Sequence, residues 1–359
     1  MSYPESPTLK SLRAGGALPP LRKPRLTSAH LVRWCAAQAN WARIHFDERY
    51  ARDVAKLPGV LVNGALKQHL LAQFLTEAFD GAGWVWRIDY DFTGMDLVGQ
   101  LLEVRGTVKT VRKLDEHALV LVDVEIQNMD RDRATTLGRA VVALRNDGEP
   151  ITDVIGQSLP DDLRLDERID GSDESVPHRI RSCLGAELDR MESDYPLDLS
   201  RLRLFADAII GLRPVHFDAR AAESSVYGVV VGPPLFPLHG LELYPGTCPL
   251  SEEPEASGRE GVTELPRNLA ARFGINPAGS INGGSSMEVH SLLRVGERVA
   301  ASSTLAGAKL RRGKTGNALL IFHTINRFSE ARGRPLLTER HASIYRIDED
   351  QLNVMAGRG

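Results

Sequence analysis

Two stretches of this chain repeat the same order of elements, and the repeat limits the folds open to it. In the first stretch the letters IHFDERYA precede a long helical pattern and four runs of alternating apolar residues. In the second, VHFDARAA stands in the same place, with His216 lying 171 residues after His45, and four alternating runs follow again. Apolar residues three or four apart predict a helix with a buried face, and alternation predicts antiparallel strands. We therefore expect two similar α+β units.

The first unit is predicted to span residues 26–146, after an extended leader over residues 1–25. Thr27 or Ser28 offers an N-cap for its first helix. A long apolar helix is predicted to begin at Gly64. Its strands are expected at WVWRIDYDF, QLLEVRGTVKTV, HALVLVDVEIQN and TLGRAVVALR.

An acidic, turn-rich stretch over residues 147–180 predicts a linker between the units. The second unit is predicted over residues 181–348, with Ser200 capping its first helix and a tail over 349–359. A Pro, Glu, Gly and Ser-rich insertion near 245–261 indicates a surface loop. The strands of this unit are expected at SSMEVHSLL, RVAASSTLAGAKL, ALLIFHTINRF and LLTERHASIYR.

Composition and charge exclude several classes of function. A formal net charge of -3 gives no basic excess, so we expect no nucleic-acid partner. No apolar run approaches the roughly 18 residues of a membrane span, and no signal-peptide pattern is visible, so we expect a cytoplasmic protein without a membrane partner. The three cysteines, Cys35, Cys183 and Cys248, lie far apart without histidines at ligand spacing, so we expect no metal site.

Several motifs resemble a known family. The first half is similar to the MaoC-like (R)-specific enoyl-CoA hydratase family in GGALPPLRKP, LVRWCAAQAN, IHFDERYA, LPGVLVNGALK and FTGMDLVGQLL. The second half resembles the dehydratase-like N-terminal units of MaoC proteins in LRLFADAI, RPVHFDARAA, VVVGPPLFP, GGSSMEVHSLLRVGERVAASSTL and HASIYR. The resemblance implies a double hot-dog, in which each of two units is a long helix wrapped by a curved antiparallel sheet.

The resemblance also implies a site at the turn around His45, here called the first elbow. The family pattern Asp-x-Asn-Pro-(Ile/Leu)-His supplies a carboxylate and an imidazole, and a His-Gly pair at the long helix supplies a backbone N–H. Matched by position, Asn40 replaces the aspartate and His45 keeps the imidazole, while Asn63 replaces the histidine of the pair and Gly64 keeps the N–H. These imply His45 as acid and base, Asn40 orienting water and Gly64 stabilising an enolate oxygen, with Asn63 contacting substrate.

The second half departs further from the family pattern. His216 is kept, but Pro234 and Leu235 fall where Asn63 and Gly64 stand. Because proline has no N–H, the backbone donor is not reproduced. We expect this half to shape an acyl tunnel or the interface between the units.

Structural interpretations stand beside these catalytic ones. His45 is alternatively a buried structural histidine, because His216 recurs without catalytic neighbours. Asp47 and Asp218, each two residues after a histidine, are expected to cap short helices. Trp41, next to Asn40, is expected near substrate.

A basic turn in the second unit suggests a site for the phosphates of coenzyme A, with a solvated hairpin turn as the alternative. Its residues are Arg311, Arg312 and Lys314. The other histidines are expected at the surface or at an interface, namely His69, His290, His323 and His341.

The function that the resemblance implies is hydration or dehydration of an acyl thioester, between 2-enoyl-CoA and 3-hydroxyacyl-CoA, with no cofactor beyond the coenzyme A of the substrate. One alternative is a non-catalytic acyl-CoA-binding hot-dog protein. Another is a hot-dog thioesterase, for which Glu77 is the available acid on the long helix. A fused pair is expected as a monomeric pseudo-dimer or as a homodimer.

Overall fold

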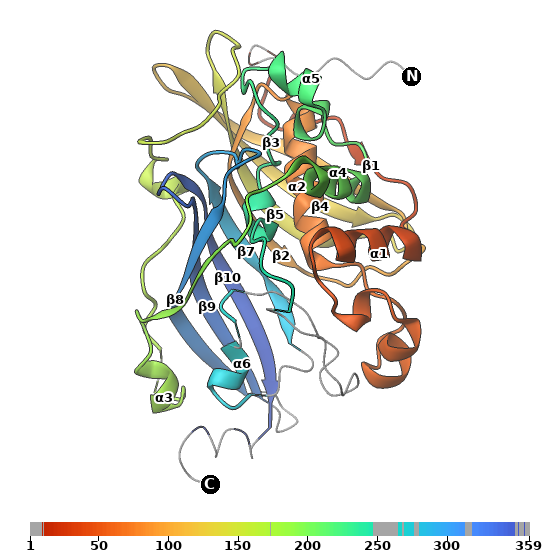
Figure 1. The fold of residues 1–359 in the computed structure, drawn as a ribbon, viewed down its shortest axis with the longest axis vertical. Helices are drawn as coiled ribbons and strands as arrows, with labels where there is room; N and C mark the ends of the chain where they lie inside the picture. Colours follow the sequence, from red (N-terminus) through yellow and green to blue (C-terminus); the bar gives the residue numbers. More distant parts are fainter. Residues whose placement is uncertain are drawn as a thin grey trace.

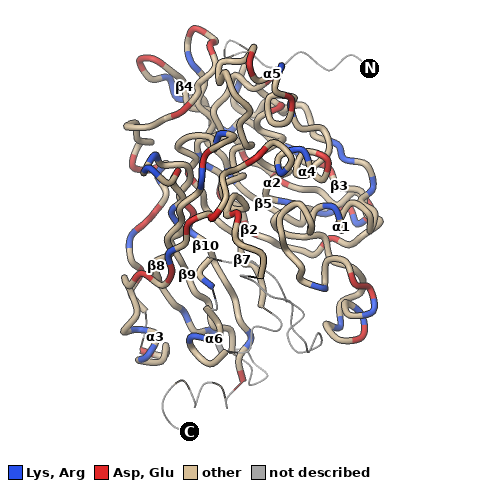
Figure 2. Tube along the Cα trace, in the orientation of Figure 1, with Lys and Arg blue, Asp and Glu red and all other residues tan. Residues whose placement is uncertain are grey.

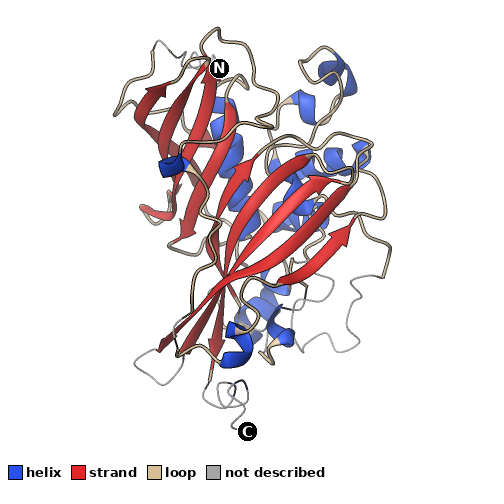
Figure 3. Ribbon diagram, turned by 90° about the vertical axis from the view of Figure 1, so that its left-hand side faces the viewer, coloured by secondary structure: helices blue, strands red, loops and turns tan. Residues whose placement is uncertain are grey.

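A computed structural model of the chain describes residues 9, 11–172, 174–246, 265–267, 269–275, 280–312, 318–348, 351 and 355. Within these residues the strands form one sheet in the order β1-β3-β4-β5-β2-β7-β10-β9-β8-β6. Figures 1 and 3 show two leaves of strands that meet near the middle of the molecule. The leaves join where β2 of the first unit pairs antiparallel with β7 of the second. The two predicted units therefore share one sheet.

Apart from strand β1, which was not predicted, the first unit has the predicted order of helices and strands. Helix α1 (Ser28–Ala37) begins after Thr27, whose side chain accepts a hydrogen bond from the backbone N–H of His30. Helix α2 (Gly64–Ala78) begins where the sequence predicts. The strands are β1 (Leu21–Arg22), β2 (Trp84–Phe92), β3 (Leu102–Lys113), β4 (His117–Asn128) and β5 (Arg133–Arg145).

Helix α2 lies against the inner face of the first leaf. On β2 the alternate residues Trp84, Trp86 and Ile88 are buried in the same core as the apolar residues of α2. Gly106 on β3 makes room for the helix, because a Cβ there would lie 2.7 Å from the ring of Phe74. The alternating pattern of the strands thus buries the helix that the sequence predicts.

The second unit begins with helices α3 (His178–Arg181), α4 (Leu199–Ile209) and α5 (Ala219–Glu223). Asp198, rather than the predicted Ser200, caps α4 by accepting a hydrogen bond from Arg201 N. Figure 1 shows α4 beside α1, which it contacts. The strands are β6 (Glu187–Glu192), β7 (Ile281–Val289), β8 (Val299–Arg312), β9 (Ala318–Glu330) and β10 (Pro335–Ile347).

A long helix was predicted in each unit. Among the described residues, the first unit has one and the second does not. At the place of α2 the second unit has a short 3-10 helix, η5 (Phe236–His239). Pro233, Pro234 and Pro237 interrupt the run of N–H donors that an α-helix needs. Helix α6 (Leu269–Arg272) is also short. Most of the predicted insertion near 245–261 lies outside the described residues.

The acidic linker crosses the outer face of the sheet. Arg87 on β2 donates to the carbonyl of Leu163, at 2.6 Å. Arg340 on β10 donates to the carbonyl of Asp166, at 2.8 Å. Figure 2 shows Lys and Arg interspersed with Asp and Glu along the chain. The linker is thus held on the sheet by basic side chains from both leaves.

The described residues contain neither a membrane-spanning helix nor a metal-binding cluster. No helix there combines the length and the apolar character needed to cross a membrane. No cluster of three or more His, Cys, Asp or Glu side chains in the same residues is arranged to hold a metal ion.

Candidate functional site

His45 ties the first elbow to the segment that leads into α2. It ends a 3-10 turn, η1 (Arg43–His45), and is buried, with its Nδ1 2.9 Å from the carbonyl oxygen of Leu61. The backbone N–H of Leu61 in turn donates to the carbonyl of Ile44, at 2.9 Å. Since a carbonyl only accepts, Nδ1 carries the hydrogen and the acceptor of the neutral ring is Nε2.

Two N–H donors lie at the start of α2. They belong to Asn63 and Gly64, two and three residues after Leu61. Asn63 caps the helix, with Oδ1 accepting from the N–H of Ala65 at 2.7 Å. Its Nδ2 is buried and has no hydrogen-bond partner among the described residues. Gly64 is the first helical residue, so its N–H has no acceptor within the helix and lies at the positive end of the helix dipole. Each of these two N–H groups is suited to a negative oxygen.

The second unit also borders the start of α2. A Cβ on Gly64 would lie 3.0 Å from the ring of Phe92, on β2, and 3.8 Å from Nδ2 of Asn282, on β7. A side chain larger than that of glycine would therefore require the ring of Phe92 to give way by a few tenths of an ångström. Because Asn282 belongs to the second leaf, both leaves contribute to the surroundings of Gly64.

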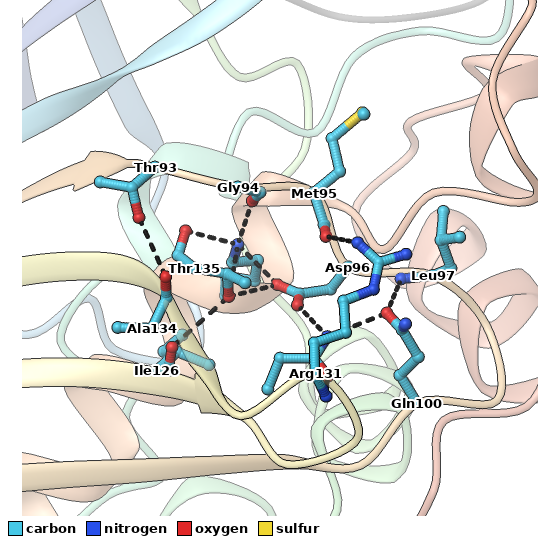
Figure 4. Close-up of polar contacts among 12 residues, drawn as sticks. Thr93, Gly94, Met95, Asp96, Leu97, Gln100, Ile126, Arg131, Ala134 and Thr135 are labelled. Atoms are coloured by element: carbon cyan, nitrogen blue, oxygen red, sulfur yellow. Dashed lines mark hydrogen bonds and ion pairs between the residues drawn. The ribbon is translucent and has the colours of Figure 1, made fainter.

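A buried polar network lies beneath the first turn of α2 (Figure 4). Lys67 Nζ lies 2.7 Å from Asp96 Oδ2, and both side chains are almost fully buried. Thr135 Oγ1 donates to Oδ2 of Asp96 at 2.7 Å, and Asn128 Nδ2 donates to Oδ1 at 2.7 Å. Burial lowers the pKa of Lys67, and the charge of Asp96 opposes that shift.

The network also fixes the chain that enters α2. The backbone carbonyl of Asp96 accepts a hydrogen bond from Val62 N at 2.8 Å, one residue before Asn63. Lys67 and Asp96 thus position Gly64 from two sides, through the helix and through the entering segment. This pair was not predicted from the sequence, whose one signal for it was a lysine in the first turns of a buried helix.

Asn40 and Trp41 lie between α1 and η1. The side-chain oxygen of Asn40 accepts from the N–H of Ala42 at 3.1 Å, which closes a local turn. Trp41 is 37% exposed and packs edge-on against Phe46. The roles predicted for Asn40, as a water-orienting group, and for Trp41, beside substrate, stay predictions.

Asp47 and Asp218 have the capping role that the sequence predicts. Asp47 accepts from the N–H of Tyr50 at 2.9 Å and pairs with Arg43 at 2.7 Å. These two interactions, the Tyr50 bond first, lower the pKa of Asp47. Asp218 caps α5 by accepting from the N–H of Arg220.

The turn around His216, here called the second elbow, has the same backbone arrangement as the first. His216 Nδ1 lies 2.9 Å from the carbonyl of Val231, as His45 does from Leu61, and burial lowers the pKa of His216 to about 4. Ala39 and Ile210, which the 171-residue offset superposes, both have left-handed φ angles, of 52° and 63°. The imidazole bond therefore has a structural role in both halves, and a catalytic role for His45 stays a prediction.

The second unit does not repeat the two N–H donors of Asn63 and Gly64. Leu235 stands where Gly64 does and precedes η5, and Pro234 stands where Asn63 does. Pro234 and His216 instead line a small cavity with Thr76 and Arg213, between the second elbow and the far half of α2.

Arg311, one of the three predicted phosphate-binding residues, lies apart from the first elbow. Arg311 is exposed on β8, which β9 and β10 separate from β7 and Asn282. The side chain of Arg312 and all of Lys314 lie outside the described residues. Their contact with coenzyme A stays a prediction.

His69 lies at the contact between the units, as the sequence analysis allowed. It is buried, and its ring centroid lies 5.4 Å from that of Trp34 and 5.1 Å from that of His239, on η5. Burial holds the pKa of His69 well below its usual value. This histidine therefore packs as a neutral ring.

Comparisons with known proteins agree with the fold. The description "hydroxyacyl-thioester dehydratase type 2" belongs to the family model that matches residues 17–95, and residues 182–339 match a "FAS1-like, dehydratase domain region". A search of curated proteins returns no match.

Solved structures resemble almost the whole chain. A MaoC domain protein from Chloroflexus aurantiacus, described as a putative dehydratase, is 12% identical with a TM-score of 0.61, covering 95% of this chain and 98% of that one. A conserved hypothetical protein from Mycobacterium tuberculosis, described as a double hotdog fold, is 14% identical with a TM-score of 0.56, covering 95% and 99%. At these identities the likeness establishes the double hot-dog fold.

Proposed function

The chain is a MaoC-like tandem hot-dog protein, and we propose that it interconverts 2-enoyl-CoA and 3-hydroxyacyl-CoA at the first elbow. Both matched family models describe dehydratases, the first of them acting on hydroxyacyl thioesters. The observation that carries the proposal is the pair of donors at the start of α2. Gly64 offers a backbone N–H, and the buried Nδ2 of Asn63 has no partner among the described residues.

The chemistry follows from these groups. In hydration, His45 accepts a proton at Nε2 from water as its oxygen bonds to C3 of the enoyl thioester. Electrons move to the thioester oxygen, and the N–H of Gly64 stabilises the resulting enolate, helped by the dipole of α2. His45 then returns the proton it took from water to C2, which completes the addition and restores the neutral imidazole, and dehydration runs the same steps in reverse.

The amide of Asn40, which replaces the carboxylate of the family pattern, determines how fast turnover is expected to be. An amide cannot act as a base at neutral pH, so Asn40 orients water through its oxygen while His45 carries the proton transfer. General acid and base groups contribute roughly 10²–10⁴-fold each, so turnover is expected to be slow. No other cofactor and no metal enters these steps.

A second candidate function is acyl-CoA binding without turnover. One observation favours it. His216 makes the same bond to a backbone carbonyl as His45 does, although the second elbow lacks the N–H donors. The bond of His45 can therefore be explained without a catalytic role. The thioesterase alternative is not favoured. Glu77 lies thirteen residues after Gly64, which is about 20 Å along the helix axis.

The test follows the loss of the conjugated double bond of trans-2-enoyl-CoA substrates of several chain lengths. We expect slow hydration that His45→Ala abolishes and that His216→Ala, in a folded protein, leaves within a few-fold. Asn40→Asp is expected to increase the rate. Turnover unaffected by His45→Ala contradicts the proposal, and a folded Asn40→Asp variant that binds acyl-CoA without turnover favours the binding function.

A further inference from the structure

The inner face of the second leaf carries a row of polar side chains at positions that are apolar or glycine in the first. The two leaves can be compared position by position. Strands β2, β5, β4 and β3 of the first leaf correspond to β7, β10, β9 and β8 of the second, and residues that pair across neighbouring strands in one leaf match residues that pair across the corresponding strands in the other. Ile88, Ala140 and Val122 pair across β2, β5 and β4, and Ser285, His341 and Thr324 pair across β7, β10 and β9. In the next register, Gly138, Val124 and Gly106 correspond to Glu339, Asn326 and Ser303. We call Ser285, Ser303, Thr324, Asn326, Glu339 and His341 the polar row.

The polar row divides the apolar core of the second unit. Along β10, Leu337 belongs to one apolar cluster and Tyr345 to another, with Glu339 and His341 between them. Burying polar groups costs free energy unless they are matched by partners, and apolar replacements are often at least as stable. The first leaf shows that this sheet folds with Val, Ala, Ile and Gly at the same positions. Stability alone therefore does not explain the row.

The polar row is a connected network around one carboxylate. Ser285 Oγ donates to Glu339 Oε1 at 2.8 Å, and Asn326 Nδ2 donates to Oε2 at 2.9 Å. Ser303 donates to Asn326 Oδ1 at 2.7 Å. Both oxygens of Glu339 thus accept hydrogen bonds from donors within the protein.

Two members of the row have hydrogen-bonding capacity left. Ser285 gives its hydrogen to Glu339, so His341 must donate from Nδ1 to Ser285 Oγ, at 2.9 Å, and the neutral ring keeps an acceptor at Nε2. Thr324, which pairs with His341 in register, is 1% exposed, and its hydroxyl has no partner among the described residues. The side chain of His341 is 21% exposed, so the row has contact with open space there.

The polar row is connected to the start of α2. Tyr90 pairs with Ser285 across the junction of the leaves, and its hydroxyl donates to Gln68 Oε1 at 2.5 Å. Gln68 lies one turn after Gly64 on α2, about 6 Å along the axis. Asn282, whose Nδ2 would lie 3.8 Å from a Cβ on Gly64, precedes Ser285 by three residues on β7, so the row begins about 10 Å along this strand from the start of α2.

We propose, on the basis of the function proposed above, that the polar row receives a hydroxyl group near the far end of the acyl chain. The preferred thioesters are then hydroxylated acyl-CoAs rather than plain alkyl ones. A hydroxyl group can donate to His341 Nε2 and share a hydrogen bond with Thr324. A terminal carboxylate is disfavoured because it would lie beside the charge of Glu339.

The test measures binding of saturated thioesters, which do not react, by isothermal titration calorimetry. We expect 6-hydroxyhexanoyl-CoA and 8-hydroxyoctanoyl-CoA to bind about threefold to tenfold tighter than hexanoyl-CoA and octanoyl-CoA, as one added hydrogen bond predicts. Adipoyl-CoA is expected to bind more weakly than 6-hydroxyhexanoyl-CoA. Thr324→Val and His341→Ala are each expected to abolish the preference, while Thr304→Val, on the outer face of β8, keeps it.

Equal or tighter binding of the alkyl thioesters at both lengths overturns the proposal, as does a preference that survives in both variants of the row. Tightest binding by adipoyl-CoA also overturns it. These results are separate from the enoyl-CoA assay: turnover with no hydroxyl preference leaves the proposed function standing, and a hydroxyl preference without turnover supports the polar row while contradicting the hydratase.

Discussion

The ammonium group of Lys67 and the carboxylate of Asp96 form a 2.7 Å ion pair beneath the first turn of α2, closed off from solvent. Lys67→Met is expected to lower the free energy of unfolding by about 3–5 kcal/mol, because it leaves the charge of Asp96 buried without its partner. Urea unfolding measures the change. The control is Lys109→Met, which removes an exposed pair with Asp123 and should cost less than about 1 kcal/mol. Equal effects of the two variants contradict the expectation.

Gly64→Ala tests the close approach at the start of α2. The new Cβ would lie 3.0 Å from the ring of Phe92, so either the ring or the helix start must move. Displacing the N–H donor is expected to lower kcat/KM for enoyl-CoA by about 10²-fold. Gly171→Ala, where a Cβ meets nothing within 4 Å, serves as the control. Unchanged kinetics in Gly64→Ala would remove the donor from the mechanism.

His216 predicts a pH dependence of stability. Burial lowers its folded-state pKa to about 4, below the unfolded value near 6.5, so the unfolded chain binds more protons between these values. Stability is therefore expected to fall as the pH drops from about 6.5 to 4, with His216 contributing about 1.4 kcal/mol per pH unit. Comparing urea unfolding of the parent and His216→Gln across this window isolates the slope. The exposed His178→Gln should keep the parental slope, and a parental slope in His216→Gln would count against the assignment.

The fold was predictable because its signals are local. The period of α2 and the alternation of β2 and β4 follow directly from which face each element buries, so their bounds were predicted closely. The two-residue edge strand β1 and the edge strand β6 were missed, because edge strands bury little and leave a weak pattern.

The candidate site could be marked from the sequence only where residue type carries the chemistry, and the roles of its residues stay predictions. His45, Asn63 and Gly64 stand out by their place in the elbow and at the helix start. The pair of Lys67 with Asp96 depends on a contact between a helix and a loop, which no spacing in the sequence reveals. The polar row could not be seen either, since its members come from four strands and become neighbours only through register.

The two elbows store backbone strain at equivalent points. Ala39 and Ile210 have φ angles of 52° and 63°, a region that costs a residue with a Cβ roughly 1–2 kcal/mol. Ala39→Gly and Ile210→Gly are therefore expected to raise the free energy of unfolding, by about 0.5–1 kcal/mol once the greater chain entropy of glycine is included. Thermal or urea unfolding measures the gain.

The matched control for this strain is Ala37→Gly, at the end of α1. There the backbone is helical, so glycine should lower the stability by up to about 1 kcal/mol. If Ala39→Gly raises the free energy of unfolding and Ala37→Gly lowers it, the left-handed backbone at residue 39 is the cause of the gain. A loss at both positions would show that side-chain packing outweighs the backbone effect.

The pairing of β2 with β7 places both leaves in one polypeptide. A homodimer must use the same residue at both copies of every position, so a change that suits one pocket is imposed on the other. Fusion removes that constraint. One copy can then retain the long helix and its N–H donors, while the other carries polar side chains where the first has apolar ones.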